Sequence, residues 1–271
     1  MSESRIIIGD GKVSKTIRKP GDIVVPHKKC DITVLADVMD TLKGFTGTVI
    51  NCAAKTNLEW CSKNRDESYL VNTVGPINIL RACQAYGCKL VHISTGCVFD
   101  GSEAPVLESD HTSPAVWYTK TKDWADSYIQ SYGYENYLIL RPRQMISSKE
   151  HSTNMITKFL SHETLYCHKE SNSITCTEDF SLMIEHLLKI DARGVYNCVN
   201  AGVVSPFEIA QMVKKHLRPR MNVVQITYDE MLDMIPEKRV NAVLSVEKLK
   251  STGFSPRSAS DALTWCLENY E

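Results

Sequence analysis

The tyrosine and lysine of the segment Tyr118-Thr-Lys-Thr-Lys122 are the residues whose types and spacing point most directly to chemistry. On a helix, a separation of four residues places both side chains on one face. A tyrosine acts as a general acid near neutral pH only if its pKa, about 10 in water, is lowered, and a neighbouring ammonium group lowers it by stabilising the phenolate. The strand predicted before this helix ends at Ser94-Thr95, whose hydroxyl can bind a substrate carbonyl. Thr95, Tyr118 and Lys122 therefore predict a reductase site.

A glycine turn follows the first predicted strand. Gly9, Gly11 and Ser14 form a Gly-x-Gly-x-x-Ser pattern. Glycines at such a turn let the backbone approach a pyrophosphate, which the N-terminus of the next helix then binds. The pattern predicts a dinucleotide site, and an ordinary turn between strand and helix is the alternative.

The end of the second predicted strand bears on the choice of cofactor. A ribose with a free 2′-hydroxyl usually meets an acidic residue there, whereas a 2′-phosphate is better matched by a cation. The segment reads Pro26-His27-Lys28-Lys29, and no acid follows until Asp31. We therefore expect NADPH, with Lys28 beside the 2′-phosphate. NADH is the alternative cofactor, and a solvated basic loop is the alternative structure.

Apolar segments of strand length alternate with amphipathic segments of helix length through the first half of the chain. Strands are predicted at Arg5–Ile8, Ile23–Val25, 47–51, 89–94 and 137–140, and helices at 34–43, 71–86 and 117–132. This alternation indicates an α/β fold with a Rossmann-type doubly wound parallel sheet, in which ligands bind beyond the carboxyl ends of the strands. The segments that could bind a ligand all follow predicted strands, at 9–14, 52–56, 94–101 and 141–146.

The alternation weakens after about residue 145, where only three elements are predicted: a helix at 206–216, a strand at 223–227 and a helix at 260–270. We predict a dinucleotide-binding Rossmann domain with the catalytic helix over residues 1–146. Residues 147–271 are predicted to form a smaller, mainly substrate-binding C-terminal lobe, interleaved with the sheet.

Composition and charge exclude several classes of protein. Of 271 residues, 43% are hydrophobic and 23% are charged, and the net charge of -1 argues against nucleic acid or an anionic membrane as a partner. No apolar run reaches the roughly 18 residues of a membrane span, and the first residues lack the apolar core of a secretory signal. The 10 cysteines are scattered without a CxxC pair, so no metal site is predicted. We expect a cytoplasmic protein.

Several segments resemble the extended short-chain dehydrogenases, particularly the dTDP-4-dehydrorhamnose reductases and the bifunctional nucleotide-rhamnose synthases, which are 3,5-epimerase/4-reductases. The segments are VINCAAKT, VNTVGPINILRAC, HISTGCVFDG, YTKTK and LILRPR, and, for the synthases, NLEWC, STGCVF, ISSKEHSTNMITK and GVYNCVNAGVVSPFEI. The resemblance covers nearly all of the chain from residue 47 and is weakest in the first 35 residues, where the glycine pattern is one residue short. It implies Thr95, Tyr118 and Lys122 as the reductase triad, Ala53, Ala54 and Lys55 against the cofactor, and Asn72 as a brace.

The same resemblance gives roles to Cys97 and Lys158. Simple reductases have Asp-Tyr where this chain has Gly96-Cys97, whereas the bifunctional enzymes and the GDP-fucose synthases have cysteine. A C4 ketone acidifies the protons on C3 and C5, and inversion needs one acid–base group on each side of the ring. A thiol, with a pKa of about 8.5, suits one of these roles. Cys97 and Lys158 are the predicted pair. His151 is the runner-up for the second role, and a buried cysteine with a surface lysine is the alternative.

Three further residues are candidates for binding the substrate. Arg143 and Gln144 follow the last predicted strand of the first half. Arg239 resembles a family position near the nucleotide diphosphate, where a planar guanidinium suits phosphate oxygens. The alternative for all three is that they are surface residues or residues that stabilise the C-terminal lobe.

We therefore predict an NADPH-dependent 3,5- (or 3-)epimerase/4-reductase that converts a nucleotide-activated 4-keto-6-deoxyhexose to an L-rhamnose-type sugar nucleotide. UDP is favoured over dTDP because the resemblance is greater to makers of UDP-rhamnose, and a 2-acetamido sugar stays open. One alternative is a 4-reductase without epimerase activity. Another is a non-catalytic NADP-binding subunit, like the regulatory subunit of methionine adenosyltransferase, against which the triad argues. The sequence leaves a homodimer open.

Overall fold

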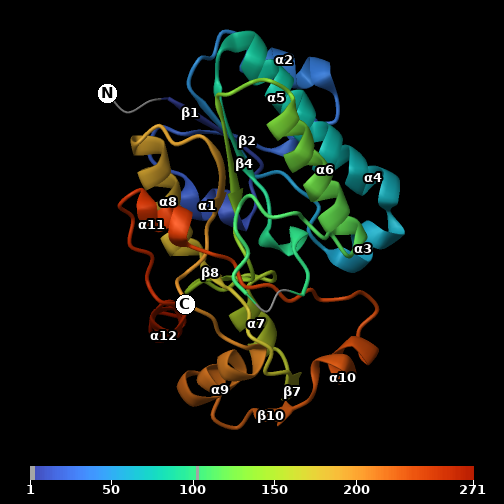
Figure 1. The fold of residues 1–271 in the computed structure, drawn as a ribbon, viewed down its shortest axis with the longest axis vertical. Helices are drawn as coiled ribbons and strands as arrows, with labels where there is room; N and C mark the ends of the chain where they lie inside the picture. The colour runs from blue at the N-terminus through green and yellow to red at the C-terminus, as the bar shows by residue number, and fades with distance from the viewer. Residues whose placement is uncertain (1–3, 102–103) are drawn as a thin grey trace. The chain divides into compact units, whose positions relative to one another are not determined.

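The structure is a computed structural model that describes residues 4–101 and 104–271 (Figure 1). The chain forms two compact units. The first runs to Val98 and adds Thr112–Arg141 and Ile190–Tyr196. The second comprises the described part of Phe99–His111 together with Pro142–Lys189 and Asn197–Glu271. Both units therefore draw on segments that are far apart in the sequence.

The first unit is built on a six-stranded sheet in the order β2-β1-β3-β4-β5-β9. Its strands are β1 (Arg5–Ile8), β2 (Ile23–Val25), β3 (Thr48–Asn51), β4 (Lys89–Ile93), β5 (Tyr137–Arg141) and β9 (Gly194–Asn197). β1 pairs in parallel with both β2 and β3, β3 with β4, and β4 with β5. The chain thus reverses its direction of growth between β1 and β3, so the carboxyl ends of these two strands flank a topological switch point. The predicted α/β fold with a Rossmann-type parallel sheet is confirmed.

The described part of the first unit has six helices: α1 (Lys12–Ile17), α2 (Leu35–Leu42), α3 (Leu58–Lys63), α4 (Arg65–Tyr69), α5 (Gly75–Tyr86) and α6 (Trp117–Ser131). Three of the six, α2, α5 and α6, follow predicted segments, and α1, α3 and α4 were not predicted. α2, α5 and α6 lie side by side in Figure 1. Apolar side chains of α2 and α5, including Val38, Leu42, Ile79 and Leu80, are fully buried in one core with residues of β1, β3 and β4. The periodicity of the apolar residues therefore placed these helices correctly.

The helix predicted over 71–86 has an irregular start that the periodicity did not indicate. A π-helical turn, η2 (Leu70–Val74), precedes α5. Pro76 has no backbone N–H to donate to the carbonyl four residues earlier, so a regular helix cannot run through this point. Gly75 also packs tightly, because a Cβ there would lie 2.4 Å from Ile32 Cδ1.

The second unit contains two small parallel sheets and six helices in its described part. The strand pairs are β6 (Met145–Ile146) with β8 (Thr175–Cys176), and β7 (Thr164–Cys167) with β10 (Asn222–Gln225). The helices are α7 (Met155–Leu160), α8 (Thr177–Lys189), α9 (Pro206–His216), α10 (Tyr228–Asp233), α11 (Glu247–Ser251) and α12 (Ala259–Glu268). α9 matches the predicted helix, and Ser205 and Glu208 cap its start by reciprocal hydrogen bonds. α8 and β9 were not predicted. In the part of the chain that the structure describes, no helix is long and apolar enough to cross a membrane.

Candidate active site

A cavity of about 320 Å³ lies at the switch point of the sheet in the first unit. The turn after β1 contributes Gly9 and Gly11, and the segment after β3 contributes residues 52–55. Gly9 has a φ of +101°, and a Cβ at this position would lie 2.9 Å from the backbone nitrogen of Ala53. Only glycine satisfies both conditions, so Gly9 allows the turn after β1 to pack against the backbone of the segment after β3.

Most of the predicted cofactor residues line this cavity. The lining contains Gly9, Gly11, Ala53, Ala54 and Lys55, but it does not contain Ser14 or Lys28. Ser14 is buried in α1, and Lys28 is exposed in a short 3-10 turn over His27–Lys29.

Two residues near the end of β2 line the cavity although the sequence analysis did not select them. His27 and Asp31 both contribute to its wall. The Oδ1 atom of Asp31 accepts hydrogen bonds from the backbone N–H of Thr33, at 2.9 Å, and from its hydroxyl, at 2.8 Å. These bonds lower the pKa of Asp31, so it is a carboxylate at neutral pH. The wall of the cavity therefore contains an imidazole, from His27, and a carboxylate, from Asp31, beside β2.

Asn72 holds the segment that follows β3. Its side-chain oxygen accepts a hydrogen bond from the backbone N–H of Lys55 at 2.8 Å, and its amide nitrogen donates to the Lys55 carbonyl at 2.9 Å. The same amide nitrogen lies 3.2 Å from Thr121 Oγ1 on α6. Asn72 is fully buried, so it fixes the cavity wall relative to the helix that carries Tyr118 and Lys122. This is the geometry expected of a bracing residue.

The predicted triad lies together in the first unit. Thr95 follows β4, and Tyr118 and Lys122 lie on α6. The Tyr118 side chain is only 9% exposed and shares a hydrogen bond with the side chain of Thr95. Burial is the main reason that the pKa of Tyr118 is raised, and the hydrogen bond to Thr95 opposes this effect. The sequence predicted that a neighbouring ammonium group lowers this pKa, but burial has the larger effect and the pKa is raised.

Lys122 is 1% exposed, and its ammonium group points toward β4. The Nζ atom donates a hydrogen bond to the Ile93 carbonyl at 2.9 Å and lies 3.1 Å from His92 Nε2. Burial lowers the pKa of Lys122 to about 8, while its electrostatic interactions with Asp126 and Cys52 oppose this effect. Cys52 lines the cavity, so its electrostatic interaction with Lys122 links the lysine to one residue of the cavity wall.

His92 and Asn51, which the sequence analysis did not select, connect Lys122 to the cavity. Asn51 Oδ1 accepts a hydrogen bond from the backbone N–H of Ala53 at 3.1 Å, which leaves the Asn51 amide nitrogen facing His92 Nδ1, also at 3.1 Å. Nδ1 must then accept, so a neutral His92 carries its hydrogen on Nε2 and directs it at Lys122. Burial lowers the pKa of His92 and keeps it neutral.

This arrangement favours the uncharged amine of Lys122. If Lys122 is an ammonium group, its hydrogen and the hydrogen on His92 Nε2 point at each other. The conflict is relieved only if His92 moves its hydrogen to Nδ1, where it then faces the Asn51 amide hydrogens. One buried polar hydrogen therefore lacks an acceptor whenever Lys122 is charged, and this costs free energy. The hydrogen bonds among Ala53, Asn51, His92 and Lys122 thus act in the same direction as burial.

Cys97 lies in the same unit as the triad. It belongs to a 3-10 turn over Gly96–Val98, is half-buried, and donates its backbone N–H to Thr95 Oγ1 at 3.1 Å. Its thiol is close enough to Tyr118 to contribute to the raised pKa of the phenol. The backbone of Cys97 is thus bonded to the Thr95 side chain, and its thiol interacts electrostatically with Tyr118.

The other predicted residues belong to the second unit. Lys158 is exposed on α7, and the His151 ring lies 2.9 Å from the Thr153 hydroxyl. Arg239 is half-buried and donates to the Glu237 carbonyl at 3.2 Å. Gln144 has a φ of +37°, and its Oε1 atom is buried without a hydrogen-bond partner among the described residues. Such strain and an unsatisfied oxygen are typical of a position that meets a ligand.

Arg143 differs from these residues because its side chain points into the second unit. It is 2% exposed, and its guanidinium donates to Asn172 Oδ1 from Nε at 2.9 Å and from Nη2 at 2.7 Å. Nη2 also donates to the Val240 carbonyl. These contacts place Arg143 where it supports the chain around Val240 rather than where it extends toward a ligand.

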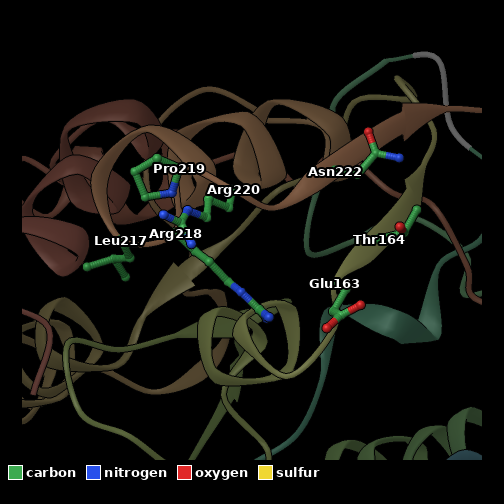
Figure 2. A pocket seen from close by; sticks show the side chains of 7 residues that line it. All are labelled: Glu163, Thr164, Leu217, Arg218, Pro219, Arg220 and Asn222. Atoms are coloured by element: carbon green, nitrogen blue, oxygen red, sulfur yellow. The ribbon is translucent and has the colours of Figure 1, made fainter.

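A second cavity, of about 660 Å³, lies between the start of β7 and the connection from α9 to β10 (Figure 2). Figure 2 shows the Arg218 side chain extending away from Pro219 and Arg220. Its Nη1 atom donates to the carbonyls of Leu160, at 2.5 Å, and His162, at 2.8 Å. The guanidinium is therefore used to join the end of α7 to the end of α9. No predicted site residue lines this cavity.

Comparison with known proteins identifies the family. The sequence model described as the RmlD substrate binding domain matches residues 11–271. The chain belongs to this family. Membership confirms the resemblance seen in the sequence to the dTDP-4-dehydrorhamnose reductases, and the match begins at Gly11, so the second glycine of the turn falls within it.

Individual relatives of the RmlD family share both sequence and fold with this chain. A bifunctional dTDP-4-dehydrorhamnose 3,5-epimerase/dTDP-4-dehydrorhamnose reductase of Arabidopsis thaliana is 27% identical over 81% of this chain and 74% of its own length. The trifunctional protein RHM1 of the same plant is 28% identical over 80% of this chain, which spans only 33% of that longer protein. The crystal structure of a Bacillus anthracis dTDP-4-dehydrorhamnose reductase in complex with NADP has a TM-score of 0.88 and 24% identity, and it covers 100% of this chain and 99% of its own. It confirms the fold.

Proposed function

We propose that this protein is an NADPH-dependent reductase of a nucleotide-activated 4-keto-6-deoxy sugar, and that it also epimerises the sugar before reduction. The observation that carries the proposal is that one unit holds both the hydrogen-bonded Thr95 and Tyr118, with Lys122 on the same helix as Tyr118, and a cavity at the switch point of its sheet. The activity of the Arabidopsis bifunctional relative and the NADP in the Bacillus anthracis structure support it.

The residues of the cavity fit a dinucleotide. Gly9 and Gly11 leave room for a pyrophosphate, because a side chain at Gly9 would collide with the Ala53 backbone. Ala53, Ala54 and Lys55 would line the remainder, held by Asn72. His27 and Lys28 would meet a 2′-phosphate, while the Asp31 carboxylate is turned onto Thr33 by its hydrogen bonds. NADPH supplies a hydride when it is bound. NADH is the alternative to test, because Asp31 lines the cavity.

Tyr118 and Thr95 would act on the C4 oxygen of the sugar. The Thr95 hydroxyl would donate to the ketone oxygen, and the Tyr118 phenol would transfer its proton to that oxygen as the ketone becomes an alcohol. A charged Lys122 would then stabilise the phenolate that remains on Tyr118. Since the pKa of Lys122 is about 8, this support weakens as the pH rises through that value.

Cys97 and Lys158 would carry out the epimerisation. One group removes the proton from C3 or C5, which leaves an enolate conjugated with the C4 ketone, and the other returns a proton to the opposite face. Cys97 lies beside Thr95 and Tyr118, which supports its role at the ring. Gln144, with its unsatisfied buried Oε1, and Arg239 would bind the substrate. We propose an L-rhamnose-type sugar nucleotide as the product, with UDP as the favoured base.

The second candidate is a 4-reductase without epimerase activity. The exposed position of Lys158 favours it, because a surface lysine is an ordinary feature of a short helix. Deuterium exchange separates the two. In D2O without NADPH, an epimerase labels C3 or C5 of UDP-4-keto-6-deoxyglucose, whereas a pure reductase leaves both unlabelled.

The reductase itself is tested by mixing the protein with NADPH and the UDP- or dTDP-4-keto-6-deoxyglucose. We expect oxidation of NADPH and an L-rhamnose-type product by NMR. Binding of NADPH without oxidation by either sugar would contradict the proposal and would indicate a non-catalytic NADP-binding subunit.

A further inference from the structure

Two cysteines and a glutamate from distant parts of the chain meet inside the second unit. The side-chain ligand atoms of Cys176, Glu178 and Cys266 all lie within 4.8 Å of one another. The two sulfur atoms are 3.6 Å apart, and Cys176 Sγ is 3.2 Å from Glu178 Oε2. Both cysteines are fully buried, and Glu178 is half-buried. None of these residues has a part in the proposed reductase.

The fold brings the three residues together through two elements. β8 ends at Cys176 and α8 starts at once, so Cys176 and Glu178 lie on either side of the first residue of that helix. Cys266 comes from the last turn of α12. α12 packs against β8, and both contribute to the same apolar core. The cluster therefore lies between the C-terminal helix and the start of α8.

Two of the three separations within the cluster are close to those that a tetrahedral metal ion requires, and the third is within 4.8 Å. With Zn–S bonds of about 2.3 Å, two sulfur ligands lie about 3.8 Å apart, and with a Zn–O bond of about 2.1 Å a sulfur and an oxygen lie about 3.6 Å apart. The observed separations of 3.6 Å and 3.2 Å need to open by only a few tenths of an ångström. A disulfide needs the two sulfur atoms to approach to about 2.05 Å, which is a far larger movement.

Glu178 is held in the orientation that a metal ligand needs. Its Oε1 atom accepts hydrogen bonds from Ser147 Oγ at 2.7 Å, Ser148 N at 3.2 Å and Ser148 Oγ at 3.1 Å. These bonds direct Oε2 at the two sulfur atoms, as outer contacts do for carboxylates that bind metals. Burial tends to raise the pKa of Glu178, but the hydrogen bonds outweigh it and the pKa is lowered. The ligand is therefore already a carboxylate.

The charges around the cluster are compatible with a bound cation. The two sulfur atoms lie 3.6 Å apart, and the pKa of the Cys266 thiol is raised, first by its hydrogen bond with Cys176 and then by burial. A divalent cation replaces both thiol protons, which are released to solvent, and leaves one net negative charge on the ion and its three ligands. Arg257 interacts electrostatically with both cysteines, although its main partner is Asp179.

We propose that Cys176, Glu178 and Cys266 form a binding site for a thiophilic divalent cation of the zinc type. Two thiolates and one carboxylate are a ligand set that zinc accepts, and solvent completes a tetrahedron. The ion joins α12 to the β8–α8 segment, so its role is to stabilise the second unit. A site of this kind is independent of the reductase proposal, and each can fail without the other.

The test uses the full chain, reduced and freed of metal with EDTA. Titration with Co²⁺ should give the thiolate-to-cobalt charge-transfer absorption and the visible bands of tetrahedral cobalt, saturating at one equivalent. Zn²⁺ should displace the cobalt and raise the midpoint of thermal unfolding. The variants Cys176→Ser and Cys266→Ser should lose the charge-transfer band, and Glu178→Gln should weaken binding about tenfold or more, as loss of a metal contact does.

Cys167→Ser is the matched control, because Cys167 is a buried thiol of the same unit outside the cluster. It should bind cobalt as the unchanged protein does. Retention of the cobalt bands by the double variant Cys176→Ser/Cys266→Ser would overturn the proposal, because other thiols would then be the ligands. The absence of tetrahedral cobalt bands in the unchanged protein would also overturn the proposal. The same holds if the two thiols oxidise to a disulfide in air and bind no cobalt. Circular dichroism of each serine variant without cobalt should match that of the unchanged protein. Loss of the cobalt bands is then not caused by unfolding of the variant.

Discussion

Replacement of Asn51 by aspartate should raise the pKa of Lys122 and move the alkaline limit of activity to higher pH. Asn51 donates to His92 Nδ1, which keeps the His92 hydrogen on Nε2 and directs it at Lys122. An aspartate offers acceptors on both oxygens. One still accepts from the Ala53 N–H, and the other accepts a hydrogen from His92 Nδ1. Nε2 then has a free lone pair that accepts from the Lys122 ammonium group.

The magnitude follows from the causes of the lowered pKa. Lys122 ordinarily titrates at 10.5, and its pKa in the structure is about 8, with burial as the largest cause. The substitution leaves burial unchanged, so it can recover only part of this difference. Relief of one unsatisfied buried hydrogen and the added negative charge should raise the pKa by about one, equivalent to about 1.4 kcal/mol.

The assay is the pH dependence of NADPH oxidation with a saturating 4-keto sugar nucleotide. If charged Lys122 supports the reaction, the rate of the unchanged protein falls as the pH rises through about 8. The rate of Asn51→Asp should fall at a pH about one unit higher. Asn51→Ala is the control, because it removes the donor without adding a charge. It should shift the limit in the same direction but less.

The tautomer of His92 gives a test that does not depend on activity. ¹⁵N NMR should show the hydrogen of His92 on Nε2 in the unchanged protein when Lys122 is uncharged, and on Nδ1 in Asn51→Asp. A hydrogen on Nδ1 in the unchanged protein at alkaline pH would refute the reasoning. An unchanged pH limit in Asn51→Asp, with the tautomer switched, would show that His92 does not influence Lys122.

Three other substitutions test the site. Tyr118→Phe should lower the rate of NADPH oxidation by about 10²–10⁴-fold, as loss of a general acid does, while fluorescence titration shows unchanged NADPH binding. Gly9→Ala should abolish NADPH binding in the same titration, because its Cβ would lie 2.9 Å from Ala53 N at a φ of +101°; retention of tight binding would place the pyrophosphate elsewhere. Lys28→Glu should raise the KM for NADPH roughly tenfold and leave that for NADH nearly unchanged, since only a 2′-phosphate needs the cation. Equal effects on both cofactors would remove Lys28 from the site.

The sequence by itself was sufficient for most of the architecture of the first unit. Apolar runs located β1 to β5, since the central strands are buried along their whole length, and apolar periodicity located α2, α5 and α6, since each buries one face. The spacing of Tyr118 and Lys122, and the position of Thr95 after β4, were also readable, because helix periodicity and strand ends are local properties. β9 was missed because its short sequence, GVYN, becomes a strand only by lying beside β5.

The tertiary structure decided which neighbours each functional group has. The packing of α6 against β4 decides that the Lys122 ammonium group lies 3.1 Å from His92 Nε2, and the burial of Tyr118 raises the pKa of its phenol instead of lowering it. The cavity wall contains His27 and Asp31 but not the exposed Lys28. The turn after β2 determines which of these side chains face the cavity, and the sequence does not reveal the path of that turn.

Cys176 and Cys266 make the same point most sharply. They are 90 residues apart in the sequence, and no spacing rule for metal ligands connects them. Periodicity reports which face of an element is buried, but not which other element will cover that face. A pKa, a tautomer and a ligand cluster all depend on atoms a few ångströms away in space, and folding alone brings those atoms together.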